Sequence, residues 1–233
     1  HERYFEPFLR NFPGKKLIVS ESTSALMTRG YYEMPSDHIY IRPESWDKPF
    51  EAPEHVCSSY DNCHVPWGST HEKTWHLVKT LPHVSGLFVW TGFDYLGEPT
   101  PYWWPSRSSF FGIVDLAGFP KDIYYMYKSE WTDEPVLHIF PHWNWKVGEP
   151  VDIWAYYNNA DEVELYLNGK SLGVQQKTDS TYHVSWRVPF TPGTLRAVSR
   201  LGGKEVLVKE IHTAGEPARL VLTPDRSVIQ ADG

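Results

Sequence analysis

The chain has 233 residues, a net charge of −7 and a sequence pI near 5.9. This length fits one large or two smaller domains, and the acidic balance argues against a nucleic-acid partner, which would favour a basic face. No apolar run is long enough to span a bilayer, and the first ten residues lack the pattern of a signal peptide. Aromatic residues make up 15% of the chain, with 11 Trp, and such side chains fill a core or form a platform for a flat ligand such as a sugar ring.

The first predicted unit is a helix followed by a strand. The helix ends near Pro13 and Gly14, and the apolar run that begins at Leu17 reads as a buried strand. Glu21 stands at the end of this strand, before a loop rich in Ser and Thr. A carboxylate there either caps the turn that follows or serves as a nucleophile or general base.

Residues 28–67 show no sustained helical or strand period, so they predict a long, irregular, aromatic-rich loop. Tyr60, Asp61 and Trp67 in this loop are candidates for lining the entrance of a site, with local packing as the alternative. The two cysteines, Cys57 and Cys63, are too few for a disulfide framework, although one local disulfide is compatible with the spacing. No His or Cys spacing predicts a metal site.

A second helix and strand repeat the order of the first unit. Ser69 or Thr70 is positioned as the helix N-cap, with Glu72 placed for a capping box, and a second apolar strand leads through Trp90 to Asp94. Helix and strand in alternation predict parallel strands, in a doubly wound sheet or a (β/α) barrel. In a barrel, Glu21 and Asp94 would both lie at the carboxyl ends of strands, where catalytic groups gather.

From Val136 onward, short runs alternate apolar and polar residues, the pattern of an antiparallel β-sandwich. Asn168 and Gly169 predict a tight hairpin there. The predicted domains are residues 1–132, the C-terminal portion of a barrel; 133–214, an immunoglobulin-like sandwich; and 215–233, the start of a further β domain or a linker. Because two strands cannot close a barrel of about eight, the chain is expected to be a piece of a larger protein.

Several motifs resemble those of glycoside hydrolase family 2, most closely its β-galactosidases from gut bacteria. They are "IVSESTS", "YDN", "PWGSTHEKTW" and "GLFVWTGFDYLGEPTPY" with the "WPSRSSFFGIVDLAGFPKD" that follows. The resemblance covers about Leu17 to Trp131. It implies the end of a catalytic (β/α)8 TIM barrel, and the "VELYLNGKSLG" segment resembles the immunoglobulin-like domain that follows the barrel in such enzymes.

The resemblance also implies roles for individual residues. Ser20-Glu21 matches the end of the seventh barrel strand, which makes Glu21 the nucleophile of a retaining mechanism. Trp90 matches the tryptophan at the end of the eighth strand, part of the floor for galactose, with barrel-mouth core as the alternative. Asp94 is a candidate for binding sugar hydroxyls, with a loop cap as the alternative. Glu98, with Trp103, Trp104, Arg107 and Lys121, is expected to shape the mouth of the site.

One departure from the family pattern has a consequence for activity. The family's acid/base glutamate, preceded by asparagine at the end of the fourth strand, has no counterpart here, so the chain alone is expected to be inactive. β-Mannosidase and β-glucuronidase activities remain alternatives, although an Asn-x-Lys triplet typical of glucuronidases is absent between Glu21 and Trp131. A third alternative is a non-catalytic carbohydrate-binding module.

The expected partners are a β-galactoside oligosaccharide and the rest of the parent polypeptide. No cofactor, nucleic acid or membrane span is expected, and an oligomer is compatible with the sequence. The family's habits imply a periplasmic or secreted parent protein in a bacterium.

Overall fold

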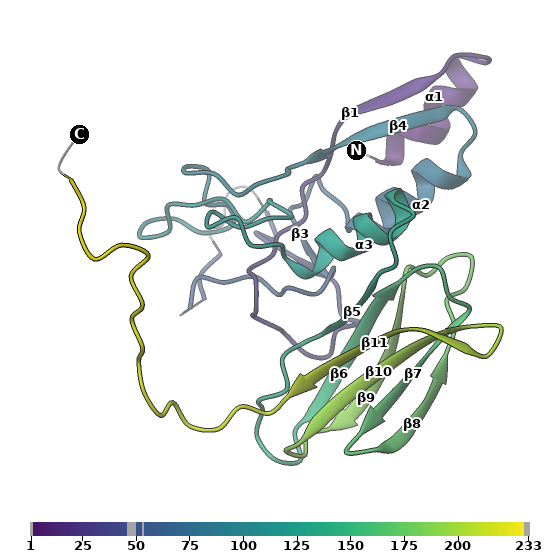
Figure 1. The fold of residues 1–233 in the computed structure, drawn as a ribbon. Coiled ribbons are helices and arrows are strands. Elements are labelled where there is room, and N and C mark those ends of the chain that lie inside the picture. The colour runs from purple at the N-terminus through teal and green to yellow at the C-terminus, as the bar shows by residue number, and fades with distance from the viewer. Residues whose placement is uncertain (1, 46–49, 53, 231–233) are drawn as a thin grey trace.

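The structure is a computed structural model that describes residues 2–45, 50–52 and 54–230. Its N-terminal part is an α/β region, and its C-terminal part is an all-β region (Figure 1). Among the described residues, no helix is both long and apolar enough to cross a bilayer. The helices are η1 (Glu2–Tyr4), α1 (Phe5–Asn11), α2 (His71–Thr80) and α3 (Asp122–Trp131).

The α/β region centres on two parallel strands, β1 (Leu17–Thr23) and β4 (Val84–Trp90). One face of this pair packs on α1 and α2 through a cluster that contains Val19, Val78 and Val84. The expected helix and strand order is therefore present, with the two strands side by side (Figure 1). The barrel that the sequence predicted would need further strands, and it stays a prediction.

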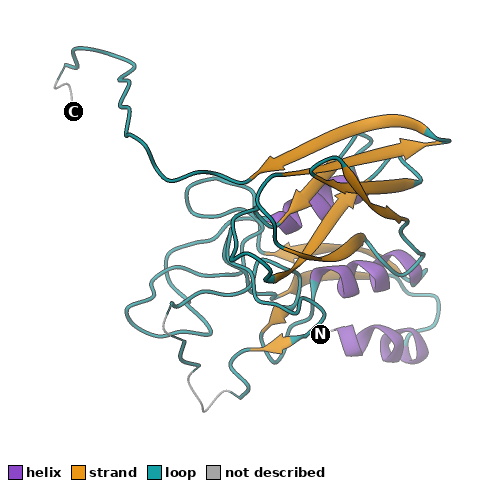
Figure 2. Ribbon diagram, turned by 90° about the horizontal axis from the view of Figure 1, so that it is seen from below, coloured by secondary structure: helices purple, strands orange, loops and turns teal. Residues whose placement is uncertain are grey.

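The chain between β1 and α2 is irregular, as its sequence indicated. Its regular structure is confined to two short paired strands, β2 (Tyr40–Ile41) and β3 (Cys63–His64), in the described part of this segment. Figure 2 shows these loops gathered on one side of the molecule. Cys57 and Cys63 are both buried and both free, so the local disulfide is not formed.

The C-terminal region is a sandwich of two antiparallel sheets. One sheet has the order β5-β6-β9 and the other has the order β11-β10-β7-β8. The strands are β5 (Leu137–Phe140), β6 (Pro150–Tyr157), β7 (Glu162–Leu167), β8 (Lys170–Gln175), β9 (His183–Pro189), β10 (Thr194–Leu201) and β11 (Lys204–His212).

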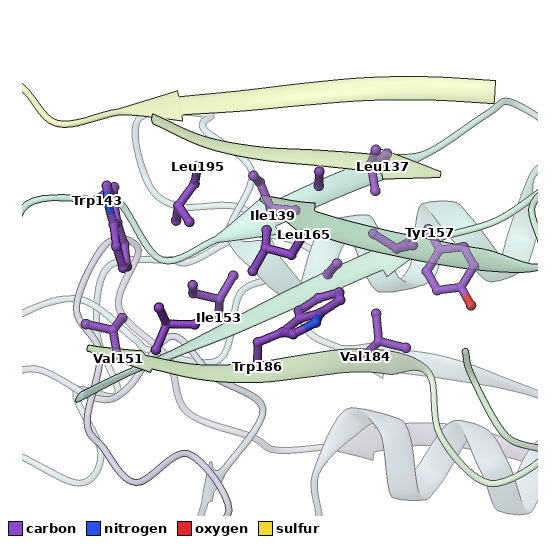
Figure 3. Packing of buried hydrophobic residues seen from close by; sticks show 14 of the residues in the cluster. Leu137, Ile139, Trp143, Val151, Ile153, Tyr157, Leu165, Val184, Trp186 and Leu195 are labelled. Carbon is purple, nitrogen blue, oxygen red and sulfur yellow. The ribbon is translucent and has the colours of Figure 1, made fainter. Parts of the chain in front are cut away.

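Alternation of apolar and polar residues builds the sandwich core (Figure 3). In β9, for example, Val184, Trp186 and Val188 point inward and are buried, while the residues between them are more exposed. The hairpin between β7 and β8 turns at Asn168 and Gly169, whose φ values of 51° and 80° place both in the left-handed region. The predicted sandwich and its hairpin are confirmed.

A second aromatic core joins the two regions. It contains Met27 and Tyr60 from the first loop, Met126 from α3, and Phe140 and Trp154 from the sandwich. In Figure 1, α2 and α3 lie between the β1–β4 pair and the sandwich. Residues 213–230 form no helix or strand and extend away from this body, so the further β domain proposed for 215–233 stays a prediction.

Candidate active site

Glu21 lies at an irregularity in β1. Val19 pairs with Leu87 and Ser22 pairs with Val89, so two residues of β1, Ser20 and Glu21, stand opposite one residue of β4. Such a bulge bends the strand and re-aims its side chains. Glu21 is exposed, and no described residue forms a hydrogen bond or an ion pair with its carboxylate.

The sequence suggested that the strand ends at Glu21. In the structure it continues to Thr23. The two residues after Glu21 are buried and hydrogen-bonded: Ser22 Oγ donates to Glu2 Oε1 at 2.7 Å, and Thr23 Oγ1 lies 3.0 Å from His71 Nδ1. His71 also lies 2.8 Å from the Tyr127 hydroxyl. Burial lowers the pKa of His71 to about 3, so the imidazole is neutral, and this network anchors the end of β1.

Trp90 occupies the corresponding end of β4, because it pairs with Thr23. Its ring packs edge-on against Tyr95, at 5.8 Å between centroids, and the Tyr95 hydroxyl donates to Glu98. Burial and the neighbouring Glu98 raise the pKa of Tyr95. Sequence reasoning missed Tyr95, since a tyrosine between two candidate residues carries no signal of its own until the loop is folded.

Asp94 is engaged by protein groups. Its Oδ2 forms an ion pair with Lys121 Nζ at 2.7 Å, and its Oδ1 accepts a hydrogen bond from the Gly112 N–H at 2.8 Å. Burial raises the pKa of Asp94 and lowers that of Lys121, while each partner's charge opposes the other's shift. Both side chains line a hollow of about 380 Å³, so Asp94 keeps some access to a ligand.

Tyr60 and Asp61 are buried away from solvent and have structural partners. The Tyr60 hydroxyl donates to the carbonyl of Asp152 in the sandwich. Asp61 accepts hydrogen bonds from the backbone N–H groups of His71 and Glu72, at 2.8 and 2.7 Å, at the start of α2. These contacts are those of local packing, the alternative that the sequence left open, and they give neither residue a place beside Glu21.

Trp67 and Glu98 differ in their surroundings. Trp67 is half-buried in an aromatic cluster that also contains Trp90 and Tyr95. Glu98 is exposed on the loop after Asp94 and is held by Tyr95. The structure therefore brings Trp90 and Glu98 into contact with Tyr95, with Trp67 in the same cluster. Glu21 lies on β1, the strand that pairs with β4 and whose Thr23 is opposite Trp90.

No group of three or more His, Cys, Asp or Glu side chains in the described part of the chain has the arrangement of a metal site. Carboxylates, aromatic faces and hydroxyls at the carboxyl ends of two parallel strands form instead a surface suited to a polyhydroxylated ligand. Glycoside hydrolysis uses a pair of carboxyl groups, and the exposed carboxylate of Glu21 is a candidate for one of them.

Comparison with known proteins shows which proteins this chain resembles. Residues 148–207 match the family described as "Domain of unknown function (DUF4982)". The chain is 63% identical to β-galactosidase BoGH2A of Bacteroides ovatus, over 96% of this chain and 26% of that protein. It is 36% identical to a putative β-glucuronidase of Formosa agariphila, over 88% of this chain and 22% of that protein.

The fold is also similar to a solved structure, a β-glycosidase from Bacteroides vulgatus. The TM-score is 0.80 at 32% identity, over 98% of this chain and 31% of that one. These similarities define the chain as glycosidase-like. It belongs to glycoside hydrolase family 2, the family that its motifs resemble, and it spans about a quarter of the length of the curated relatives it matches.

Proposed function

We propose that this chain forms the end of the catalytic barrel, and the sandwich that follows it, in a retaining β-galactosidase whose nucleophile is Glu21. The observation that carries the proposal is the register of β1 and β4. It sets Glu21, in its bulge, beside the strand that ends at Trp90. The 63% identity to a protein named as a β-galactosidase supports the choice of sugar.

The exposed side of β1 supports the barrel. Ile18 and Phe88 stand 62% and 67% exposed on the face opposite the helices. A hollow of about 400 Å³ follows the free side of β1 and is lined by Phe5, Phe8 and residues 17–21. Further parallel strands would cover both surfaces and continue the barrel, since parallel sheets are buried on both faces.

In the proposed reaction, Glu21 attacks the anomeric carbon of the galactoside and forms a glycosyl ester. A carboxylic acid protonates the glycosidic oxygen, and water then releases the sugar with its configuration retained. We place this acid outside the 233 residues, at the roughly 5–5.5 Å from Glu21 that retaining enzymes require. Trp90 supports the C–H face of the sugar, and Glu98 and Asp94 are within the region that would bind its hydroxyls.

β-Glucuronidase is the second candidate, because a relative of this chain bears that name. A glucuronide carries a carboxylate, which calls for a free cation. Among the described residues, the two cations that line the hollow beside Asp94 are already paired: Lys121 with Asp94, and Arg29 with Asp115 at 2.6 Å. This pairing favours a neutral sugar.

Covalent trapping tests the proposal. The complete protein that carries this chain is incubated with 2-deoxy-2-fluoro-β-galactosyl fluoride, and the labelled peptide is located by mass spectrometry. We expect the label on Glu21, and we expect Glu21→Gln to lower kcat/KM by at least about a thousandfold, or about 4 kcal/mol of transition-state stabilisation. Glu6→Gln, at an exposed carboxylate of α1, is the matched control.

The corresponding mannosyl and glucuronyl reagents test which sugar the enzyme removes. Label from the glucuronyl reagent alone would replace the galactosidase with a glucuronidase while keeping Glu21 as the nucleophile. Label on a different carboxylate, or none with any reagent alongside no hydrolysis, would contradict the catalytic role and favour a carbohydrate-binding module.

A further inference from the structure

A third hollow, separate from the one along β1 and the one beside Asp94, is walled by two loops. Phe50, Glu51, Ala52 and His55 form one side, and Trp103 and Trp104 form the other, around a volume of about 480 Å³. This volume falls in the range of about 300–1,000 Å³ that is usual for small-ligand sites. The hollow is therefore large enough for a sugar residue.

The walls are held together by contacts between the loops. His55 Nδ1 lies 2.9 Å from Ser106 Oγ. Tyr102, which is buried, packs against both His55 and Phe50, at 4.8 and 5.5 Å between ring centroids. These links fix the two loops relative to each other, so the hollow is preorganised and a ligand would not have to order it.

Two tryptophans at this site are largely exposed. Trp103 and Trp104 are 68% and 74% exposed. The guanidinium of Arg107 lies 4.5 Å from the centre of the Trp104 ring, which stiffens that side chain and leaves the cation engaged. Rigid exposed aromatic faces are costly in water, and they are characteristic of binding surfaces.

The chemistry of the lining selects the ligand. Among its described residues, the lining offers aromatic faces, one carboxylate at Glu51 and one imidazole at His55. Aromatic faces bind the C–H side of a pyranose, and a carboxylate accepts hydrogen bonds from hydroxyls. A phosphate or a uronate would meet the Glu51 charge, and no lining residue in the described set is a Lys or an Arg. The fit is to a neutral sugar.

The hollow and the candidate active site rest on one hydrophobic cluster. Phe50 and Ala52, which line the hollow, pack against the same buried cluster as Trp67 and Trp90. Resting on the proposed function, we propose that Trp103 and Trp104 form a subsite for a neutral pyranose of the leaving group, next to the galactose that Glu21 would attack. The enzyme would then act on a galactosyl unit carried by a neutral oligosaccharide.

Binding by the 233-residue chain tests the subsite without catalysis. The chain is titrated with cellotetraose, a neutral β-linked tetrasaccharide, while the indole N–H signals are followed by NMR. We expect the Trp103 and Trp104 signals to shift and saturate at millimolar ligand. Trp104→Ala should weaken binding at least about fivefold, and Glu51→Gln should weaken it less.

The matched control is Phe119→Ala, which removes another exposed aromatic ring, and it should bind as the unmodified chain does. Cellotetraouronate, the β-1,4-linked tetramer of glucuronate and thus the acidic counterpart of cellotetraose, should bind more weakly. Thermal unfolding of each variant confirms that it is folded. Equal binding by the unmodified chain and Trp104→Ala, or shifts confined to other indoles, would overturn the proposal.

The binding experiment and the trapping experiment can fail independently of each other. Label on Glu21 with unchanged binding in Trp104→Ala would keep the catalytic proposal and remove this subsite. Loss of binding in Trp104→Ala without label on Glu21 would leave a sugar-binding site without the proposed chemistry.

Discussion

Asp94 shows how closely single residues are constrained at the end of β4. The Gly112 backbone passes so near that a Cβ on Gly112 would lie 2.1 Å from the Asp94 nitrogen and 2.6 Å from the Val114 carbonyl oxygen. The N–H of Gly112 also donates to Asp94. Glycine is required here because the two backbones are in contact, and this contact sets the Asp94 carboxylate against Lys121.

We therefore expect Gly112→Ala to destabilise the protein. Backbone atoms must separate to admit the methyl group, at a cost of about 3 kcal/mol, or a fall in Tm of roughly 10 °C for a chain of this size. Gly92→Ala, on the same loop system but with no atom within 4 Å of the point that a Cβ would occupy, is the control. Differential scanning calorimetry of both variants makes the comparison, and equal Tm values would contradict it.

For single residues, the sequence predicted the position in a strand better than it predicted the hydrogen-bond partners. Trp90 could be placed at the end of its strand, and Glu21 two residues before the end of its own, because the apolar runs before them are visible in the sequence. Tyr60 and Asp61 could not be assigned, since their partners, Asp152 and the start of α2, lie far along the chain or depend on its folding.

At the scale of elements, the N-terminus of α2 is capped by a threonine and by a buried carboxylate whose pKa is raised. The structure selects Thr70 as the N-cap, with Oγ1 accepting from the Lys73 N–H at 3.4 Å. The predicted capping box is wrong, because Glu72 instead places Oε1 2.7 Å from His183 Nδ1 in the sandwich. The buried carboxylate of Asp61 supplies the additional cap.

Burial, reinforced by the charge of Glu72, raises the pKa of Asp61 from 3.8 to about 7. Between these pH values the folded protein keeps a proton that the unfolded chain has released. The contribution of Asp61 to stability is therefore present in acid and is lost as the pH rises toward 7. His71, with its lowered pKa, has the opposite dependence, so the two partly cancel in the unmodified protein.

Asp61→Asn should separate these effects. The free energy of unfolding of the variant, relative to that of the unmodified protein, should increase by about 1.4 kcal/mol per pH unit between pH 4 and 7. The His71 contribution is common to both proteins and cancels in this difference. Urea denaturation at several pH values measures it, with Asp133→Asn, at an exposed aspartate, as the control. A difference that is flat with pH would contradict the raised pKa.

The sandwich strands were the elements most accessible to sequence reasoning. In β9 and β10, inward residues alternate with outward ones, and this period is set by local geometry alone. The loops between β1 and β4 were recognised only as irregular, because their shape depends on contacts such as that between His55 and Ser106, 51 residues apart.

At the scale of the whole molecule, the two regions differ in how fully their sheets are covered. The sandwich has its own closed core, and it also shares the aromatic core of Tyr60, Phe140 and Trp154 with the α/β region. The β1–β4 pair, in contrast, is covered by helices on one face, while Ile18 and Phe88 are exposed on the other. The proposed barrel rests on this asymmetry together with family membership, and sequence periodicity alone does not distinguish a barrel from an open doubly wound sheet.

The exposed face predicts that the 233-residue chain associates with itself. Exposed apolar side chains beside unpaired strand edges favour intermolecular contact, so sedimentation velocity should show oligomers that increase with protein concentration. Phe88→Ser should shift the chain toward monomer, whereas Val208→Ser, at a 46% exposed position on β11, should not. In the complete protein the same Phe88→Ser change should instead lower Tm, because there the barrel interior would bury this ring. A chain that stays monomeric at all concentrations would show that this face needs no cover, and it would remove the structural support for the barrel.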